Sequence, residues 1–96
     1  MENYHEPHDK LSNETKDYSR AMVSLTEEIE AVDWYQQRID VTDDQQLKKI
    51  LMHNRDEEIE HASMLLEWLR RNMDGWDEQL HRYLFSKKDI LKVEKA

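Results

Sequence analysis

The chain has 96 residues, with 22 acidic against 14 basic side chains, a formal net charge of -8 and no cysteine. This negative field repels phosphate backbones, which disfavours nucleic acid as a partner. The absence of cysteine excludes disulfides, thiolate zinc sites and iron–sulfur clusters, so any metal must be held by carboxylates and histidines.

The composition predicts an almost entirely helical protein, because a single glycine and a single proline leave few breaks in a chain rich in Glu, Lys, Gln, Leu and Arg. No apolar run approaches the roughly 18 residues of a membrane span, and the N-terminus lacks the features of a signal peptide. We therefore expect no membrane partner and a cytoplasmic location. A domain this small hides only ~60–65% of its unfolded surface, so we expect oligomerisation.

The N-terminal residues 1–11 carry the proline and no periodicity, and they are predicted to form a flexible arm. A first helix is expected to start at Ser12 or Asn13, either of which can cap it, and to run to about Asp40. Its apolar residues follow the four-three spacing of a helix packed along another helix: Tyr18, Met22, Leu25, Ile29, Val32 and Ile39.

A second helix is predicted after a very short turn, opened by a capping box at Thr42 with Gln45 or at Asp43 with Gln46. It should run to about Met73. A tight turn between two long helices predicts an antiparallel hairpin.

A short third helix is expected from a cap at Asp74 through Phe85. The predicted fold class is therefore all-α, an antiparallel two-helix hairpin plus a short C-terminal helix. We assign the helical domain to residues 12–86 and a C-terminal tail to residues 87–96.

The two long helices each carry a glutamate inside an otherwise apolar stripe. The stripes consist of Ala21, Leu25, Glu28, Val32, Tyr35 and Ile39, and of Leu47, Leu51, Asn54, Glu58, His61, Leu65 and Trp68. Both glutamates should point into the packing interface. Burying an unpaired carboxylate costs several kcal/mol, which a bound cation would offset.

Glu58 and His61 lie about 4.5 Å apart along the helix axis, so both can reach one ion. Carboxylate oxygen with imidazole nitrogen suits iron or manganese, and also zinc, better than calcium or magnesium. A lone Glu-x-x-His is more often a solvated surface pair. Here the motif lies in the apolar stripe, and Glu28 stands at a similar distance before the turn as Glu58 after it, which favours the metal interpretation.

Di-iron carboxylate bundles take one glutamate from each of two helices and a Glu-x-x-His from each of two others. This chain has one of each. A two-fold dimer that brings Glu28, Glu58 and His61 against their copies would complete the set and form a ferritin-like four-helix bundle.

Four segments carry a family resemblance: EEIEAVDWYQQR (27–38), HNRDEEIEHA (53–62), LEWLRRN (66–72) and YLF (83–85). They resemble the encapsulated ferritins, ferroxidases that work inside encapsulin nanocompartments. The resemblance implies oxidation of Fe(II) to Fe(III) at two irons held by Glu28, Glu58 and His61 of two subunits. It also implies a homodecameric ring of dimers that delivers iron to mineral storage in an encapsulin shell, with calcium or zinc as surrogate ions in crystals.

The resemblance further implies that Glu27 and Glu30 take up metal, that Trp34 is a gate, and that Tyr35 has a catalytic role beside the ligands. The spacing agrees in part, because Glu27, Glu30 and Trp34 share one helical face. An ordinary solvated face, with Trp34 packing at a ring contact, is the alternative.

His53, Glu57 and Glu60 share another face, which is either an outer metal site or a solvated charged surface. Methionines at helical spacings, Met22, Met52 and Met64, are interpreted as core residues. Trp68 and Trp76 are expected to pack at helix ends. The family's short apolar targeting peptide is not found up to Ala96, so encapsulation depends on the resemblance alone.

Two other functions compete with ferroxidase activity. A rubrerythrin-like peroxide reductase uses a similar di-iron bundle but normally adds a cysteine-ligated iron, which this chain lacks. A non-catalytic hairpin that self-associates would satisfy its Glu and His through arginines such as Arg55 or through water.

Overall fold

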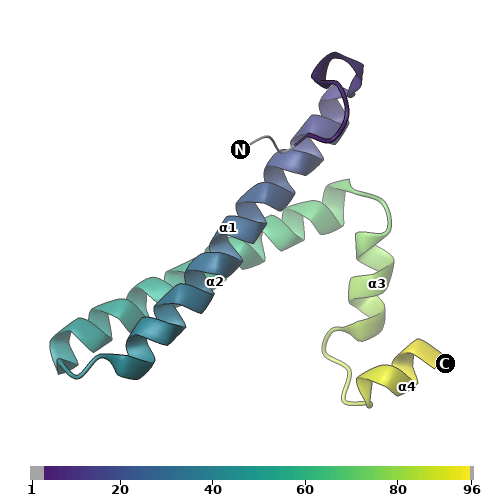
Figure 1. Cartoon of the computed structure of the whole chain (residues 1–96). Helices are drawn as coiled ribbons and strands as arrows, with labels where there is room; N and C mark the ends of the chain where they lie inside the picture. The colour runs from purple at the N-terminus through teal and green to yellow at the C-terminus, as the bar shows by residue number, and fades with distance from the viewer. Residues whose placement is uncertain (1–3, 96) are drawn as a thin grey trace.

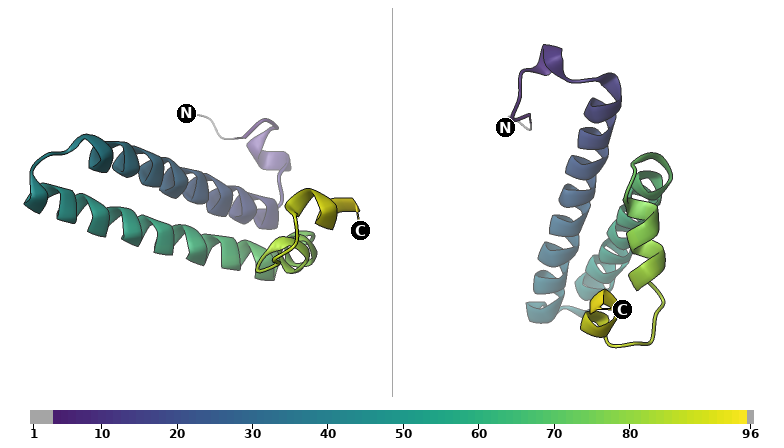
Figure 2. Two further views of the ribbon diagram at one scale, coloured as in Figure 1. Left: turned by 90° about the horizontal axis from the view of Figure 1, so that it is seen from below. Right: turned by 90° about the vertical axis from the view of Figure 1, so that its right-hand side faces the viewer.

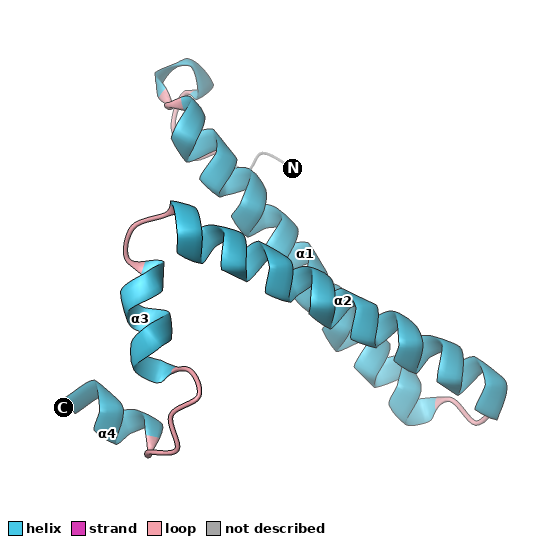
Figure 3. Ribbon diagram, turned by 180° about the vertical axis from the view of Figure 1, so that it is seen from behind, coloured by secondary structure: helices cyan, strands magenta, loops and turns pink. Residues whose placement is uncertain are grey.

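The structure of the chain is a computed structural model that describes residues 4–95. Within that range every element is helical, which confirms the all-α fold class. The elements are a short 3-10 turn η1 (His8–Lys10) and the helices α1 (Asn13–Val41), α2 (Gln45–Asn72), α3 (Trp76–Tyr83) and α4 (Ile90–Lys95). Loops separate them at the two bends and at the hairpin turn (Figure 3).

Helices α1 and α2 form the predicted antiparallel hairpin and run side by side for most of their length (Figures 1 and 2). Ser12, one of the two expected caps, caps α1, because its hydroxyl oxygen accepts a hydrogen bond from the Thr15 amide at 3.0 Å. No helix within residues 4–95 is long and apolar enough to cross a membrane.

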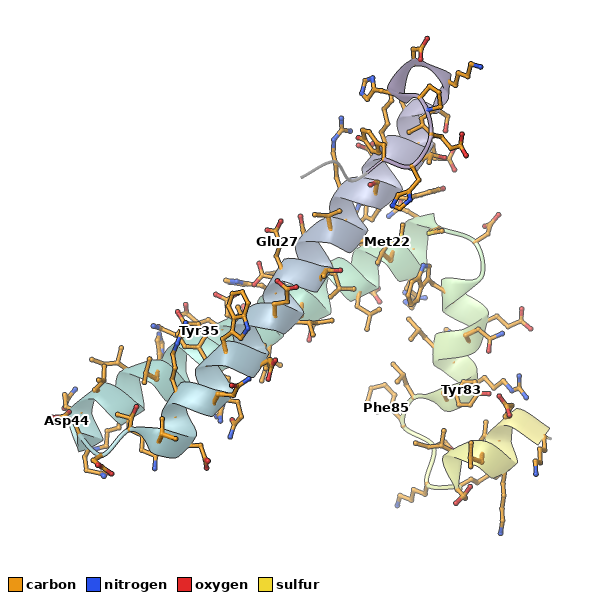
Figure 4. The ribbon with its side chains drawn as sticks, viewed as in Figure 1. Met22, Glu27, Tyr35, Asp44, Tyr83 and Phe85 are labelled. Carbon is orange, nitrogen blue, oxygen red and sulfur yellow. The ribbon has the colours of Figure 1, made fainter. Side chains whose placement is uncertain are left out.

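The predicted cap of α2 was wrong by one or two residues. Asp44, at the hairpin turn in Figure 4, caps the helix by accepting from the Leu47 amide at 2.8 Å. Thr42 is engaged with the end of α1 instead, since its hydroxyl donates to the Arg38 carbonyl. The backbone carbonyl of Asp43 accepts from the Gln45 side chain.

The open end of the hairpin is joined by Tyr18 on α1. Its hydroxyl lies 2.9 Å from the Asn72 carbonyl oxygen, and its ring meets the Trp68 ring edge to face with centroids 6.3 Å apart. Leu69, beside Trp68, is the one described side chain with no exposed surface. These contacts fix α1 against α2 at the end opposite the turn.

The bend between α2 and α3 depends on Gly75, whose φ of 99° lies in the left-handed region that favours glycine. Gly75 precedes α3 directly, so the predicted cap at Asp74 was wrong. Arg70 joins the two helices by donating to Asp77 on α3 and to Glu67 on α2. In Figure 1, α3 turns away from the long axis of the hairpin after this bend.

The C-terminal residues 87–96, predicted as a tail, contain the short helix α4. Arg82 of α3 holds its C-terminal end by donating to the carbonyls of Val93 at 2.9 Å and Glu94 at 2.6 Å. Val93 is buried there. The helix was missed because its anchor is an arginine contact that sequence periodicity does not reveal.

Many large apolar side chains of the single chain are exposed. Met52 and Met64 are among them, so their interpretation as core residues was wrong for the single chain, whereas Met22 is partly buried. The other exposed residues are Ile29, Trp34, Val41, Leu47, Ile50, Ile59, Trp68, Leu84, Phe85, Ile90 and Leu91. Trp68 and Trp76 lie near helix ends as expected, and the Trp76 indole contacts the Met73 sulfur at 3.3 Å.

Leu69→Ala should destabilise the protein by about 2–5 kcal/mol, because the site is fully enclosed and a cavity would replace the lost methyl groups. Urea unfolding at one fixed protein concentration measures this loss. Leu91→Ala is the matched control, since Leu91 is exposed and its truncation should cost little. Equal losses in the two variants would contradict this account of the core.

Glu67 should contribute stability that disappears only in strong acid. Hydrogen bonds from Arg70 and then Arg71 lower the pKa of its carboxyl from 4.5 to about 2. A lowered folded-state pKa contributes stability that is complete above 4.5 and is lost as the pH falls through 2. The Tm difference between the parent and Glu67→Gln should therefore shrink as the pH falls from 4.5 to 2, which thermal melts can measure. A constant Tm difference would contradict the stabilising role of the hydrogen bonds from Arg70 and Arg71 to Glu67.

Candidate metal centre

Three side chains predicted to bind metal come together between α1 and α2. Glu28 projects from α1, and Glu58 and His61 lie one turn apart on α2. The Nδ1 atom of His61 is 3.7 Å from Oε2 of Glu28 and 3.8 Å from Oε2 of Glu58. One ligand atom from each residue lies within 4.8 Å of the others, and no other such group occurs within residues 4–95.

The spacing of these atoms suits a bound ion. Bonds of about 2.1 Å to a first-row metal place opposite ligand atoms about 4.2 Å apart. Moving the three side chains together by less than ~1 Å would therefore bring all of them into contact with one ion. The antiparallel hairpin supplies this arrangement, because it sets Glu28 opposite the Glu58–His61 turn.

The carboxylate of Glu28 lacks a partner within the described chain. Its Oε2 atom is buried and has no hydrogen bond, and the His61 contact at 3.7 Å is too long to be one. The side chains of Glu28, Glu58 and His61 are 24%, 25% and 43% exposed. A buried acceptor without a donor is costly, and a cation satisfies it directly.

In a purely structural hairpin, arginines such as Arg55, or water, were expected to satisfy these glutamates and the histidine. The guanidinium of Arg55 is engaged elsewhere, donating to Gln36 at 2.8 Å across the hairpin and to the neighbouring Asp56. Gln36 is a polar residue at an otherwise apolar position of the four-three spacing on α1, and it accepts the hydrogen bond from Arg55. This polar residue in the apolar series was the sequence signal that could have predicted the contact.

Tyr35 lies seven residues after Glu28, about 10 Å further along α1. Tyr35 is labelled in Figure 4 and is partly buried. The guanidinium carbon of Arg38 lies 5.5 Å from the centre of its ring. The predicted catalytic role of Tyr35 stays a prediction.

The residues predicted to take up metal lie on the exposed surface of α1. Glu27 and Glu30 are exposed, and Trp34 is 52% exposed. Figure 4 shows Glu27 projecting from this helix. These three residues are not part of the ligand group around Glu28.

The predicted outer site is only partly assembled. His53 and Glu57 form an exposed ion pair, with Nε2 and Oε1 2.9 Å apart. Glu60 instead lines a shallow depression with Met64 and Trp68. The structure therefore brings together two of these three residues.

Comparison with known proteins gives matches along almost the whole chain. The family model described as EncFtn-like matches residues 3–87. A ferritin-like protein of Thermotoga maritima is 60% identical over 91 residues, covering 95% of this chain and 80% of that protein. An encapsulated ferritin-like protein of Rhodospirillum rubrum is 55% identical over 92 residues, covering 96% of this chain and 66% of that protein.

A solved structure shares both the sequence and the fold. The crystal structure of protein ne0167 from Nitrosomonas europaea is 55% identical, with a TM-score of 0.89 over 93% of this chain and 98% of that chain. The fold is therefore ferritin-like. Because the family match and both relatives span most of the sequence, the chain belongs to the EncFtn-like family of ferritin-like proteins.

Proposed function

We propose that this chain is a ferroxidase whose centre forms between two copies. In this arrangement Glu28, Glu58 and His61 of each copy bind two Fe(II) ions, which O2 oxidises to Fe(III). The observation that supports the proposal most strongly is the buried, partnerless Oε2 of Glu28 beside Glu58 and His61. Family membership supports an iron-related function independently.

A second copy is needed because one chain offers half of a di-iron ligand set. A two-fold axis beside Glu28 would supply the other half with the same three residues. Ile29 and Ile59, next to the two glutamates in sequence, are exposed in the single chain. Pairing of the hairpins would cover apolar surface of this kind while completing the site.

The reaction draws Fe(II) from solution toward a protein with a net charge of -8. Exposed Glu27 and Glu30 would take up the cation on α1, with Trp34 controlling its passage. Two Fe(II) ions, one O2 and two protons give two Fe(III) ions and one H2O2. The carboxylates stabilise the growing positive charge, and His61 completes each ligand set.

The cellular location and the larger assembly are inferred by analogy with the family. The Rhodospirillum relative is described as encapsulated, and we extend that location to this chain. Dimers would assemble into a decameric ring of ten subunits in a cytoplasmic encapsulin compartment, where Fe(III) would pass into mineral. The exposed His53–Glu57 pair, with Glu60 nearby on the helix, would bind metal outside the main centre.

Replacing Glu58 or His61 with alanine should abolish rapid Fe(II) oxidation, because symmetry removes the ligand from both halves of one site. Glu27→Ala and Glu30→Ala should change the rate and leave the centre able to turn over. Absorbance under air follows the Fe(III) product.

Stability gives the control for those variants. In chelator, Glu58→Ala should melt no lower than the parent, because the deletion removes a poorly paired, partly buried carboxylate. Loss of activity without loss of folding would then identify a ligand. Parental oxidation rates in Glu58→Ala would show that this site is not the ferroxidase centre.

Metal should also promote assembly, since an ion bound only across the interface favours the dimer by about 2.7 kcal/mol at a hundred times its Kd. The test uses sedimentation velocity at a concentration where the chelated protein is largely dissociated. Zn(II), which O2 cannot oxidise, should increase the dimer fraction in the parent and not in His61→Ala. Equal distributions with Zn(II) and with chelator would contradict a shared site.

A further inference from the structure

Tyr18 of α1 and Trp68 of α2 form an aromatic pair, and Trp68 lies on the same α2 stripe as Glu58 and His61. Their rings meet edge to face, with centroids 6.3 Å apart and planes at 63°. Trp68 lies seven residues after His61 on α2, which is two helical turns and about 10 Å along the axis. The pair is therefore near enough to the centre to exchange an electron with it and too far to be a ligand.

The hydroxyl of Tyr18 has a proton acceptor beside it. It lies against the Glu14 carboxylate, and the Asn72 carbonyl oxygen is 2.9 Å away. A phenol has one proton, and the charged carboxylate is the stronger acceptor. The hydrogen bond to Glu14, followed by burial and the charge of Glu14, raises the pKa of Tyr18 to about 12, so the phenol is neutral at physiological pH.

Two other tyrosines have the opposite environment. The Arg38 guanidinium faces the Tyr35 ring at 5.5 Å, and that of Arg82 faces the Tyr83 ring at 5.3 Å. A cation over an aromatic ring is attracted to its electrons and makes their removal harder. Tyr18 instead has a carboxylate that favours loss of an electron together with the proton.

We infer that Trp68 and Tyr18 form a one-electron relay that draws oxidising equivalents away from the metal centre, with Glu14 as the proton acceptor. The oxidant for this relay rests on the proposed ferroxidase function. The aromatic contact, the hydroxyl–carboxylate hydrogen bond and the position of Trp68 on the stripe of Glu58 and His61 are properties of the chain itself.

Each step of the relay transfers one electron. One Fe(II) and one H2O2 give Fe(III), hydroxide and a hydroxyl radical. Trp68 supplies one electron, which reduces that radical to hydroxide. Tyr18 returns one electron to Trp68, and its hydroxyl proton passes to Glu14. The net change is one hydroxyl radical reduced and one neutral tyrosyl radical formed about 10 Å along the helix from His61.

A photochemical experiment tests the pair without iron. A ruthenium photo-oxidant with a sacrificial electron acceptor generates tryptophan radicals in the metal-free 96-residue chain, and transient absorption follows their decay. In the parent, tryptophan radical should convert to tyrosyl radical. Tyr18→Phe should remove most of the tyrosyl signal and lengthen the tryptophan radical's lifetime several-fold, and Glu14→Gln should slow the conversion.

The matched control is Tyr83→Phe, which should behave as the parent does because Tyr83 lies on α3 beneath an arginine. Equal lifetimes in the parent and Tyr18→Phe would overturn the relay. Circular dichroism melts verify that each variant is folded, and Trp68→Phe provides a second route, since it should remove the same tyrosyl signal.

An iron experiment links the relay to the centre. Fe(II) and H2O2 are mixed with the protein and frozen within milliseconds for electron paramagnetic resonance. A tyrosyl radical should form in the parent and in Tyr83→Phe and be absent in Tyr18→Phe. If the parent does not oxidise Fe(II), the proposed function fails while the photochemical result still decides the relay; a tyrosyl signal persisting in Tyr18→Phe would overturn the relay alone.

Discussion

The buried Oε2 atom of Glu28 is the constraint on which the rest of this molecule depends. A carboxylate oxygen removed from water without a donor is costly, and here neither His61 nor Arg55 supplies one. Glu58 and His61 lie beside this oxygen and could bind a cation together with it. Without a cation, the partly buried carboxylate of Glu58 would add to this free-energy cost, whereas with a cation it would serve as a second ligand. A bound cation, as proposed, would offset the cost of both carboxylates.

The geometry of the group is set far from the group itself. At one end the Asp44 cap starts α2 after a three-residue turn, and at the other Tyr18 contacts Trp68 and Asn72. With both ends fixed, the register of the two helices places Glu28 opposite His61. A slip of one helical turn at either end would separate these side chains by about 5 Å.

Helical spacing was sufficient to predict the hairpin and the approach of Glu28 to Glu58 and His61, and capping chemistry narrowed the start of α1 to Ser12 or Asn13, of which Ser12 is the cap. Each depends on periodicity or on one local hydrogen bond. The caps of α2 and α3 and the helix α4 were not predicted correctly, because several polar residues at each bend can serve as caps and tertiary contacts decide among them. The three residues predicted as an outer site share a face, but only His53 and Glu57 meet, since a shared face does not fix side-chain directions.

The near absence of fully buried side chains bears on the fate of an unassembled chain. Leu69 alone among the described residues has no exposed surface, while apolar side chains such as Ile29, Ile59 and Phe85 are open to solvent. Such surface is what chaperones bind and what brings proteases to a loosely held chain. If the chain pairs as we propose, a copy without a partner would be short-lived in the cell, and surplus chains would be removed by turnover. The abundance of the protein would then follow the number of assemblies completed rather than the rate of synthesis.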